Sequence, residues 1–98
     1  MIVNSEIEAY CVNHSSAMSE QLAEIETYTQ AHIPQSHMLS GALQGNLLKL
    51  LCQLTQAKNI LEIGTFTGFS SIAMAEGLSD EGKIYTIEKD EKLVQRLK

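Results

Sequence analysis

The residues best suited to chemistry lie in one short stretch, residues 59–71, and at one acidic position further on, Glu88. The stretch reads NILEIGTFTGFSS: an apolar run reaches a glycine, continues through small and hydroxyl residues, and then takes up helical periodicity. This order predicts a strand, a tight turn and a helix, an arrangement that binds nucleotide-type cofactors. In such folds an acidic residue about 20 positions past the turn hydrogen-bonds a ribose. Glu88 stands where that residue is expected.

Two glycines flank the predicted turn, and each is expected to have a backbone role. Gly64 follows the strand directly and permits backbone angles that other residues avoid. Gly68 lets the start of the following helix pack close to the strand and lets a ligand approach the main chain. Phe66 stands between them, where a dinucleotide-binding motif has a further glycine. Because a pyrophosphate needs close backbone donors at that bare glycine, the bulk of Phe66 favours a cofactor without a pyrophosphate.

Glu62 is an acid inside an otherwise apolar strand, and its charge would be costly to bury without a partner. A cationic or amino-bearing cofactor nearby, directly or through water, would account for it. A lysine or a backbone donor elsewhere in the fold would account for it too, and this residue alone does not decide between them.

S-adenosylmethionine has chemical groups that match these residues: a sulfonium, an ammonium, a ribose with two hydroxyls and no phosphate. Gly64, Phe66 and Gly68 are then expected to line its methionine and ribose side. Ser70 would hydrogen-bond the methionine carboxylate, and the Glu88 carboxylate would accept from both ribose hydroxyls. The plainer alternatives are a helix cap for Ser70 and a solvated strand end for Glu88.

The first forty residues are predicted to be a helical lead-in. Ser5 and Glu8 have the spacing of a capping box and start a short helix that extends through Tyr10. Ser19 starts a second helix, and Pro34 ends it because proline disfavours helical geometry at the residue before it.

The rest of the chain is predicted to alternate between helices and strands. A helix at 41–56 carries an apolar stripe that we assign to core packing in preference to a partner-binding face; its members are Leu43, Leu47, Leu50, Leu51 and Leu54. A strand at 60–63 is expected to be buried on both faces, as in parallel sheets. A helix at 70–78, a strand at 84–87 and a last helix capped by Asp90 complete a βαβ unit of a doubly wound α/β fold.

Composition restricts the class of protein. The chain has 98 residues, 44% of them hydrophobic and 19% charged, which is typical of one globular domain. It has no apolar run of the roughly 20 residues needed to span a bilayer and no visible secretory signal, so we expect a cytoplasmic protein without a membrane partner. The net charge of −5 disfavours nucleic acid as a partner.

The cysteines and histidines give no clear metal motif. Cys11 and Cys52 are far apart, so two reduced thiols are expected, without a disulfide or a zinc site. His32 and His37 bracket a proline and could suggest a metal pair, but polar residues are common in a turn before a helix. We favour the second interpretation.

Three segments together resemble one family. LEIGTFTGFS, YTIEKDE and HMLSGALQGNLLKLL are similar to the cation-dependent O-methyltransferases of the caffeoyl-CoA and catechol type, over residues 35–98. The resemblance implies a Rossmann-like S-adenosylmethionine-dependent methyltransferase fold. It also implies cofactor contacts at Ser40, Glu62, Gly64, Phe66, Ser70 and Glu88. Phe69 departs mildly from the family, which usually has tyrosine there.

The resemblance further implies methyl transfer to a hydroxyl of a small, catechol-like acceptor, and a homodimer as in bacterial members. In the family a divalent cation, usually magnesium, is held by residues of the later half, so we expect neither metal ligands nor catalytic residues in this chain. Two strands would also leave a doubly wound sheet largely uncovered. We therefore expect residues 1–98 to be the N-terminal part of one methyltransferase domain, with a helical lead-in at 1–40 and a cofactor-binding helix and βαβ unit at 41–98.

Two other functions remain open at this point. A nicotinamide-dependent oxidoreductase shares the strand, turn, helix and ribose-binding acid. A non-catalytic module that associates through its helices would need none of the cofactor contacts, and its association would be indifferent to changes at Gly64 and Glu88.

Overall fold

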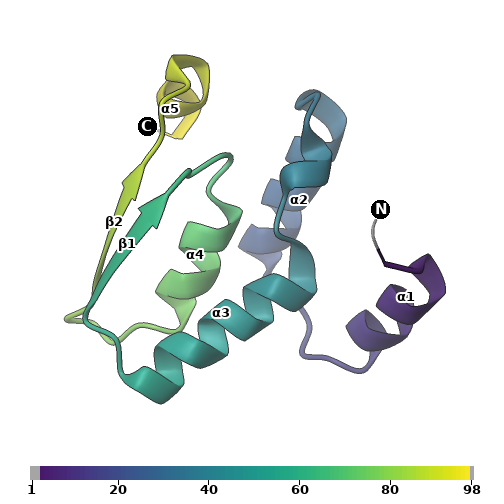
Figure 1. The fold of residues 1–98 in the computed structure, drawn as a ribbon, viewed down its shortest axis with the longest axis horizontal. Coiled ribbons are helices and arrows are strands. Elements are labelled where there is room, and N and C mark those ends of the chain that lie inside the picture. The colour runs from purple at the N-terminus through teal and green to yellow at the C-terminus, as the bar shows by residue number, and fades with distance from the viewer. Residues whose placement is uncertain (1–2, 98) are drawn as a thin grey trace.

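The computed structural model describes residues 3–97, with helices throughout and two strands in the second half (Figure 1). The elements are α1 (Ser5–Asn13), α2 (Glu20–His32), the 3-10 turn η1 (Ser36–Met38), α3 (Gly41–Thr55), β1 (Asn59–Ile63), α4 (Phe69–Glu76), β2 (Lys83–Ile87) and α5 (Glu91–Leu97). The predicted order of elements is confirmed. None of the helices within these residues is both long and apolar enough to cross a membrane.

β1 and β2 form a parallel pair, and α4 connects them as the helix of a βαβ unit. The register pairs Asn59 with Lys83 and Ile63 with Ile87, so both strands end at the same edge. Because the carboxyl ends of parallel strands are where α/β folds bind ligands, this edge is where a cofactor site is expected. The predicted α/β class is confirmed for the described residues.

Within residues 3–97, one face of the two-stranded sheet is covered and the other is not. Ile60, Glu62 and Ile84 lie on the face toward α4 and are partly buried. The opposite face exposes Leu61, Ile63, Tyr85 and Ile87. Figure 1 shows the helices gathered on one side of the strands and none beyond them on the other. The prediction that the first strand is buried on both faces is therefore wrong for the residues that the structure describes, because their helices cover one face of it.

α3 packs against α4 through small residues. A methyl group added at Gly45 would lie 3.0 Å from the Phe69 ring, and one at Gly77 would lie 2.5 Å from the Lys49 carbonyl oxygen. Cys52 is buried in the same contact. The close approach depends on residues without bulk, so the face of α3 that meets α4 is not its leucine-rich face.

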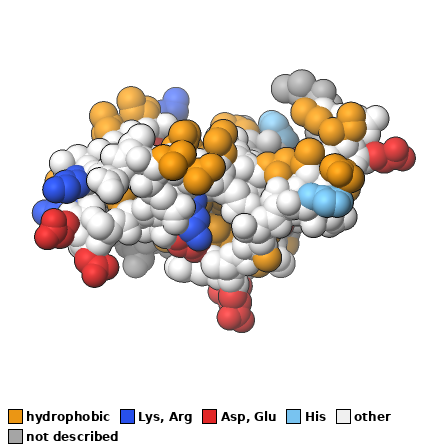
Figure 2. All heavy atoms as spheres, turned by 90° about the horizontal axis from the view of Figure 1, so that it is seen from below, with side chains coloured by type: hydrophobic (Ala, Val, Ile, Leu, Met, Phe, Trp, Pro, Cys, Tyr) orange, Lys and Arg blue, Asp and Glu red, His pale blue; other side chains and the backbone are white. Residues whose placement is uncertain are grey.

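The leucine stripe of α3 is consequently exposed over most of its length. Leu47, Leu50, Leu51 and Leu54 are all exposed, and only Leu43 is partly buried. Our assignment of the stripe to core packing is wrong for the described residues. Figure 2 shows the molecule from below, with hydrophobic side chains in several separate groups across this face, one of them at the right-hand end over α1.

The core lies between α2 and α4. Leu22 of α2 packs with Phe69 and Ala73 of α4, and four partly buried residues complete the cluster: Met18, Ile25, Leu39 and Ile72. α2, which belongs to the lead-in, thus packs directly against the helix that follows the predicted cofactor turn.

The helix starts follow the sequence with one correction. Ser19 caps α2 by accepting from the Leu22 amide at 3.3 Å, as predicted. α1 is capped by Asn4, whose side-chain oxygen accepts from the Glu6 amide at 2.8 Å, so the predicted capping box at Ser5 does not form. The asparagine one position earlier satisfies the first free amides, and the helix extends to Asn13 instead of ending at Tyr10.

Candidate cofactor-binding site

The turn between β1 and α4 has an alternating left-handed backbone. Gly64, Phe66 and Gly68 have φ angles of 93°, 54° and 90°. The Gly64 amide donates to the Ile87 carbonyl at 2.7 Å, and the Gly68 amide donates to the Thr65 carbonyl at 3.0 Å. The predicted unusual backbone angle of Gly64 is confirmed, and Gly68 has a positive φ as well. The approach of a ligand to the main chain at Gly68 stays a prediction. The sequence did not predict the positive φ of Phe66, which is rare for a bulky residue and persists only where its surroundings enforce it.

Glu88 directly follows β2 and holds this turn through its carboxylate. Its Oε1 accepts from the Phe66 amide at 2.8 Å, and its Oε2 accepts from the Asp90 amide at 3.0 Å. These backbone hydrogen bonds, the one from Asp90 first, lower the pKa of Glu88 below its ordinary value. Each carboxylate oxygen can accept more than one hydrogen bond. Glu88 is therefore ionised at neutral pH and still able to accept from a pair of ligand hydroxyls.

Glu62 is held by hydroxyl groups. Ser70 donates to its Oε2 at 2.5 Å, Thr86 donates to its Oε1 at 2.8 Å, and Ser71 donates to the same Oε1. The partners in this structure are thus neither a lysine nor a backbone amide. The Ser70 proton, which we assigned to a ligand carboxylate, is used here by Glu62, although the Ser70 oxygen can still accept.

Sequence reasoning missed Ser71 and Thr86 as members of this cluster. Thr86 lies directly opposite Glu62 in the strand register. Aligning the two predicted strands would have placed this hydroxyl beside the acid, because residues paired in register point to the same face. Ser71 gave no such signal, since a serine near a helix start is commonly a cap.

Four of the predicted residues line one small depression between η1 and the turn, of about 60 Å³: Ser40, Gly64, Phe66 and Ser70. Ser40 is the N-cap residue of α3, yet its side chain makes no capping hydrogen bond. A methyl group placed on Gly64 would meet nothing within 4 Å, so the main chain there is open to a ligand.

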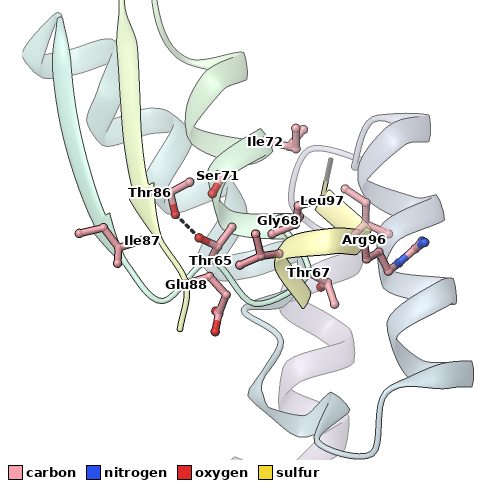
Figure 3. Close-up of a pocket in the computed structure, with 12 residues that line it drawn as sticks. Thr65, Thr67, Gly68, Ser71, Ile72, Thr86, Ile87, Glu88, Arg96 and Leu97 are labelled. Carbon is pink, nitrogen blue, oxygen red and sulfur yellow. Dashed lines mark hydrogen bonds between the residues drawn. The ribbon is translucent and has the colours of Figure 1, made fainter. Parts of the chain in front are cut away.

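The other side of the turn borders a larger, open cavity of about 730 Å³ (Figure 3). Gly68 and Glu88 line it, together with Arg96 and Leu97 of α5. Figure 3 also shows the Thr65 and Thr86 hydroxyls joined by a hydrogen bond, which is 2.5 Å long. Among the seven predicted residues, Glu62 alone lines neither space, and its contact with Ser70 links it to the depression.

The size of the depression limits what it does alone. Pockets that enclose small ligands have volumes of roughly 300–1,000 Å³, so about 60 Å³ is part of one wall only. Its groups suit one side of S-adenosylmethionine: the main chain at Gly64 is open, and the Ser40 hydroxyl caps no helix amide. The Glu88 carboxylate, which can accept from a diol, lies on the larger cavity at the other side of the turn. Within residues 3–97 no group of three or more His, Cys, Asp or Glu side chains could hold a metal ion.

Comparison with known proteins gives the family. The family model for O-methyltransferases matches residues 12–97. A probable caffeoyl-CoA O-methyltransferase of Dictyostelium discoideum is 36% identical over 81 residues, covering 83% of this chain and 35% of the relative. A catechol O-methyltransferase of Niastella koreensis is 55% identical over 49 residues, covering 50% of this chain and 22% of the relative.

The solved structures agree with the sequence relatives. The SAH-bound methyltransferase PaMTH1 of Podospora anserina superposes with a TM-score of 0.88 at 29% identity, covering 99% of this chain and 44% of that one. The fold is therefore part of a Rossmann-like methyltransferase domain. The chain belongs to the O-methyltransferase family of the caffeoyl-CoA and catechol type. It spans about a third of the length of the first curated relatives it matches.

Proposed function

We propose that the protein containing this chain transfers a methyl group from S-adenosylmethionine to a hydroxyl of a small, catechol-like acceptor, and that this chain supplies part of the cofactor site. The observation that carries the proposal is the ionised Glu88 carboxylate, fixed by the Phe66 and Asp90 amides at the carboxyl end of β2. A carboxylate so placed suits a ribose diol. The SAH-bound relative and the names of the catechol and caffeoyl-CoA relatives support the cofactor and the acceptor class.

Each residue of the site has a proposed part in binding. Glu88 accepts from the two ribose hydroxyls, and the open main chain at Gly64 lets the cofactor lie against the turn. Gly68 borders the larger cavity beside Glu88. Phe66 borders the methionine and ribose side. Ser40 and Ser70 supply hydroxyls for the methionine end. Glu62 acts through Ser70 or, through water, on the cofactor's ammonium.

These residues bind and orient the cofactor, and the reaction is an in-line displacement at its sulfonium methyl group. Holding the methyl group in line with an acceptor hydroxyl accounts for much of the acceleration. A divalent cation such as magnesium, bound by residues outside this chain, would supply the lowering of the acceptor hydroxyl's pKa. A cytoplasmic location and a homodimer remain predictions, and sedimentation of the whole protein tests the second.

Calorimetry tests which cofactor binds. The protein used is the one encoded by the longest reading frame that contains this chain. We expect S-adenosylmethionine to bind and NAD to give no heat. Glu88→Ala and Gly64→Val should each abolish detectable cofactor binding, because one removes the diol acceptor and the other places a β-branched residue at a φ of 93°. Glu81→Ala, in the exposed turn before β2, is the matched control and should leave binding unchanged.

A methyl-transfer assay with a panel of catechols, with and without magnesium, tests the acceptor. Methylated catechol that disappears on chelation supports the proposal. Binding of NAD without any response to S-adenosylmethionine would favour an oxidoreductase. If the protein binds neither cofactor and its self-association is the same in the Glu88 and Gly64 variants, a non-catalytic module would be favoured.

A further inference from the structure

Phe66 is held in an unfavourable backbone conformation at the centre of the cofactor turn. Its φ of 54° costs free energy for an aromatic residue. The conformation matters because it aims the Phe66 amide at Glu88, 2.8 Å away. The residues on either side of Phe66 must therefore be fixed by contacts outside the turn.

The two neighbours of Phe66 are threonines, and the side chain of each is tied to a different element. Thr65 hydrogen-bonds the Thr86 hydroxyl of β2 at 2.5 Å. Thr67 shares a hydrogen bond of 2.9 Å with the hydroxyl of Thr29 in α2. Thr65 and Thr67 are both buried, and Thr29 is 0% exposed. Residues 65–67 are thus held from the sheet on one side and from the lead-in helix on the other.

We propose that Thr29 is a positioning residue for cofactor binding: from α2 it fixes Thr67 and so holds Phe66 in the left-handed conformation that the site requires. The proposal rests on the proposed function, and it extends the site to a helix in the part of the chain that showed no functional motif. Thr29 touches no ligand in this scheme. Its effect passes through the hydrogen bond with Thr67, which we call the Thr29–Thr67 bridge.

The two ends of the bridge differ in a way that a test can use. The Thr29 hydroxyl lies between Thr67 Oγ1 and the Ile25 carbonyl oxygen, which is 2.7 Å away, so its single proton keeps an acceptor when Thr67 is changed. For Thr67, the hydroxyl of Thr29 is the one side-chain partner found within residues 3–97. Thr29→Val therefore leaves a buried hydroxyl unpaired in the turn, whereas Thr67→Val leaves none, and an unpaired buried polar group is the costlier defect.

The experiment measures two properties of the protein expressed in its longest reading frame. The first is the Kd for S-adenosylmethionine by calorimetry, and the second is amide hydrogen exchange of residues 64–68 without ligand. We expect Thr29→Val to raise the Kd by about tenfold and to speed exchange in the turn. Thr67→Val should raise the Kd less. The kcat at saturating cofactor should stay close to that of the unaltered protein.

Two controls separate positioning from general destabilisation. Thr29→Ser keeps the hydroxyl and should return both the Kd and the exchange close to the unaltered values. Thr27→Val makes the same change at an exposed position of α2 and should alter neither. If Thr29→Val does not fold, Thr67→Val examines the same hydrogen bond from the turn.

The outcomes against the proposal are distinct from those against the proposed function. If the unaltered protein does not bind S-adenosylmethionine, the proposed function is refuted. Amide hydrogen exchange of residues 64–68 in Thr29→Val then shows by itself whether the Thr29–Thr67 bridge holds the turn. If the unaltered protein binds and Thr29→Val binds equally well, the positioning role is refuted and the function stands. Equal weakening by Thr29→Val and Thr29→Ser would also overturn it, because the hydroxyl would not be the cause.

Discussion

Glu88 combines a structural contact and a proposed ligand contact in one carboxylate. Its hydrogen bonds from the Asp90 and Phe66 amides favour the ionised form and lower its pKa. The sign follows from that shift: the stabilisation is present above the ordinary pKa and is lost as the pH falls through the lowered folded value. Protonation would weaken the turn and the diol contact together.

The pH dependence of cofactor binding should show the effect of protonating Glu88. We expect Glu88→Gln to raise the Kd for S-adenosylmethionine by about tenfold or more, because a neutral amide replaces a charged acceptor. The ratio of the two Kd values should be constant from neutral pH down to the ordinary glutamate pKa of 4.5 and should shrink only below it. Calorimetry across this range measures the ratio, with Glu81→Gln as the control. A ratio that already changes near neutral pH would contradict the assignment.

The sequence predicted part of the site at residue scale, and the division has a physical reason. Gly64 and Gly68 could be found because a positive φ favours glycine, and Glu88 because its spacing from the turn is set by the βαβ unit. The Thr29–Thr67 bridge could not be found, since its ends are 38 residues apart and meet only when α2 packs on α4.

At the scale of elements, the contact between α3 and α4 shows why a hydrophobic pattern can mislead. The leucines of α3 correctly predicted a helix, because their spacing matches its period. The pattern did not tell which face meets a neighbour within this chain. Gly45 and Cys52 form that face, and small residues allow two helices to approach closely.

This packing gives a prediction for stability. Gly45→Val should destabilise the protein by about 2 kcal/mol, because the new side chain overpacks the contact with Phe69, where even a methyl group would lie at 3.0 Å. Leu47→Ala, on the exposed face of the same helix, should change the free energy of unfolding by less than about 0.5 kcal/mol. Chemical denaturation measures both. A larger loss from Leu47→Ala would show that the leucine face is the packed one in the protein tested.

At the scale of the whole molecule, the uncovered face of the sheet is the main departure from a finished α/β domain. Parallel sheets are normally covered on both faces. Here Leu61 and Ile63 of β1 stand beside Tyr85 and Ile87 of β2, all exposed and adjacent in the register. Contiguous apolar surface of this kind promotes association. The exposed leucines of α3 form a second such surface, and a substitution on each surface can show which of them causes the association.

The 98-residue chain produced by itself should self-associate, and the sheet face should dominate because its apolar side chains lie on a flat, unpaired surface with free strand edges. Ile63 is 81% exposed and Leu54 of α3 is 70% exposed, which makes them a matched pair. Sedimentation should show Ile63→Lys shifted toward monomer, because a charge on this face opposes its burial, with Leu54→Lys much less changed. The reverse order would place the association on α3. It would also favour the alternative hypothesis, a non-catalytic module that associates through its helices. The comparison of the two variants therefore tests the function as well as the associating surface.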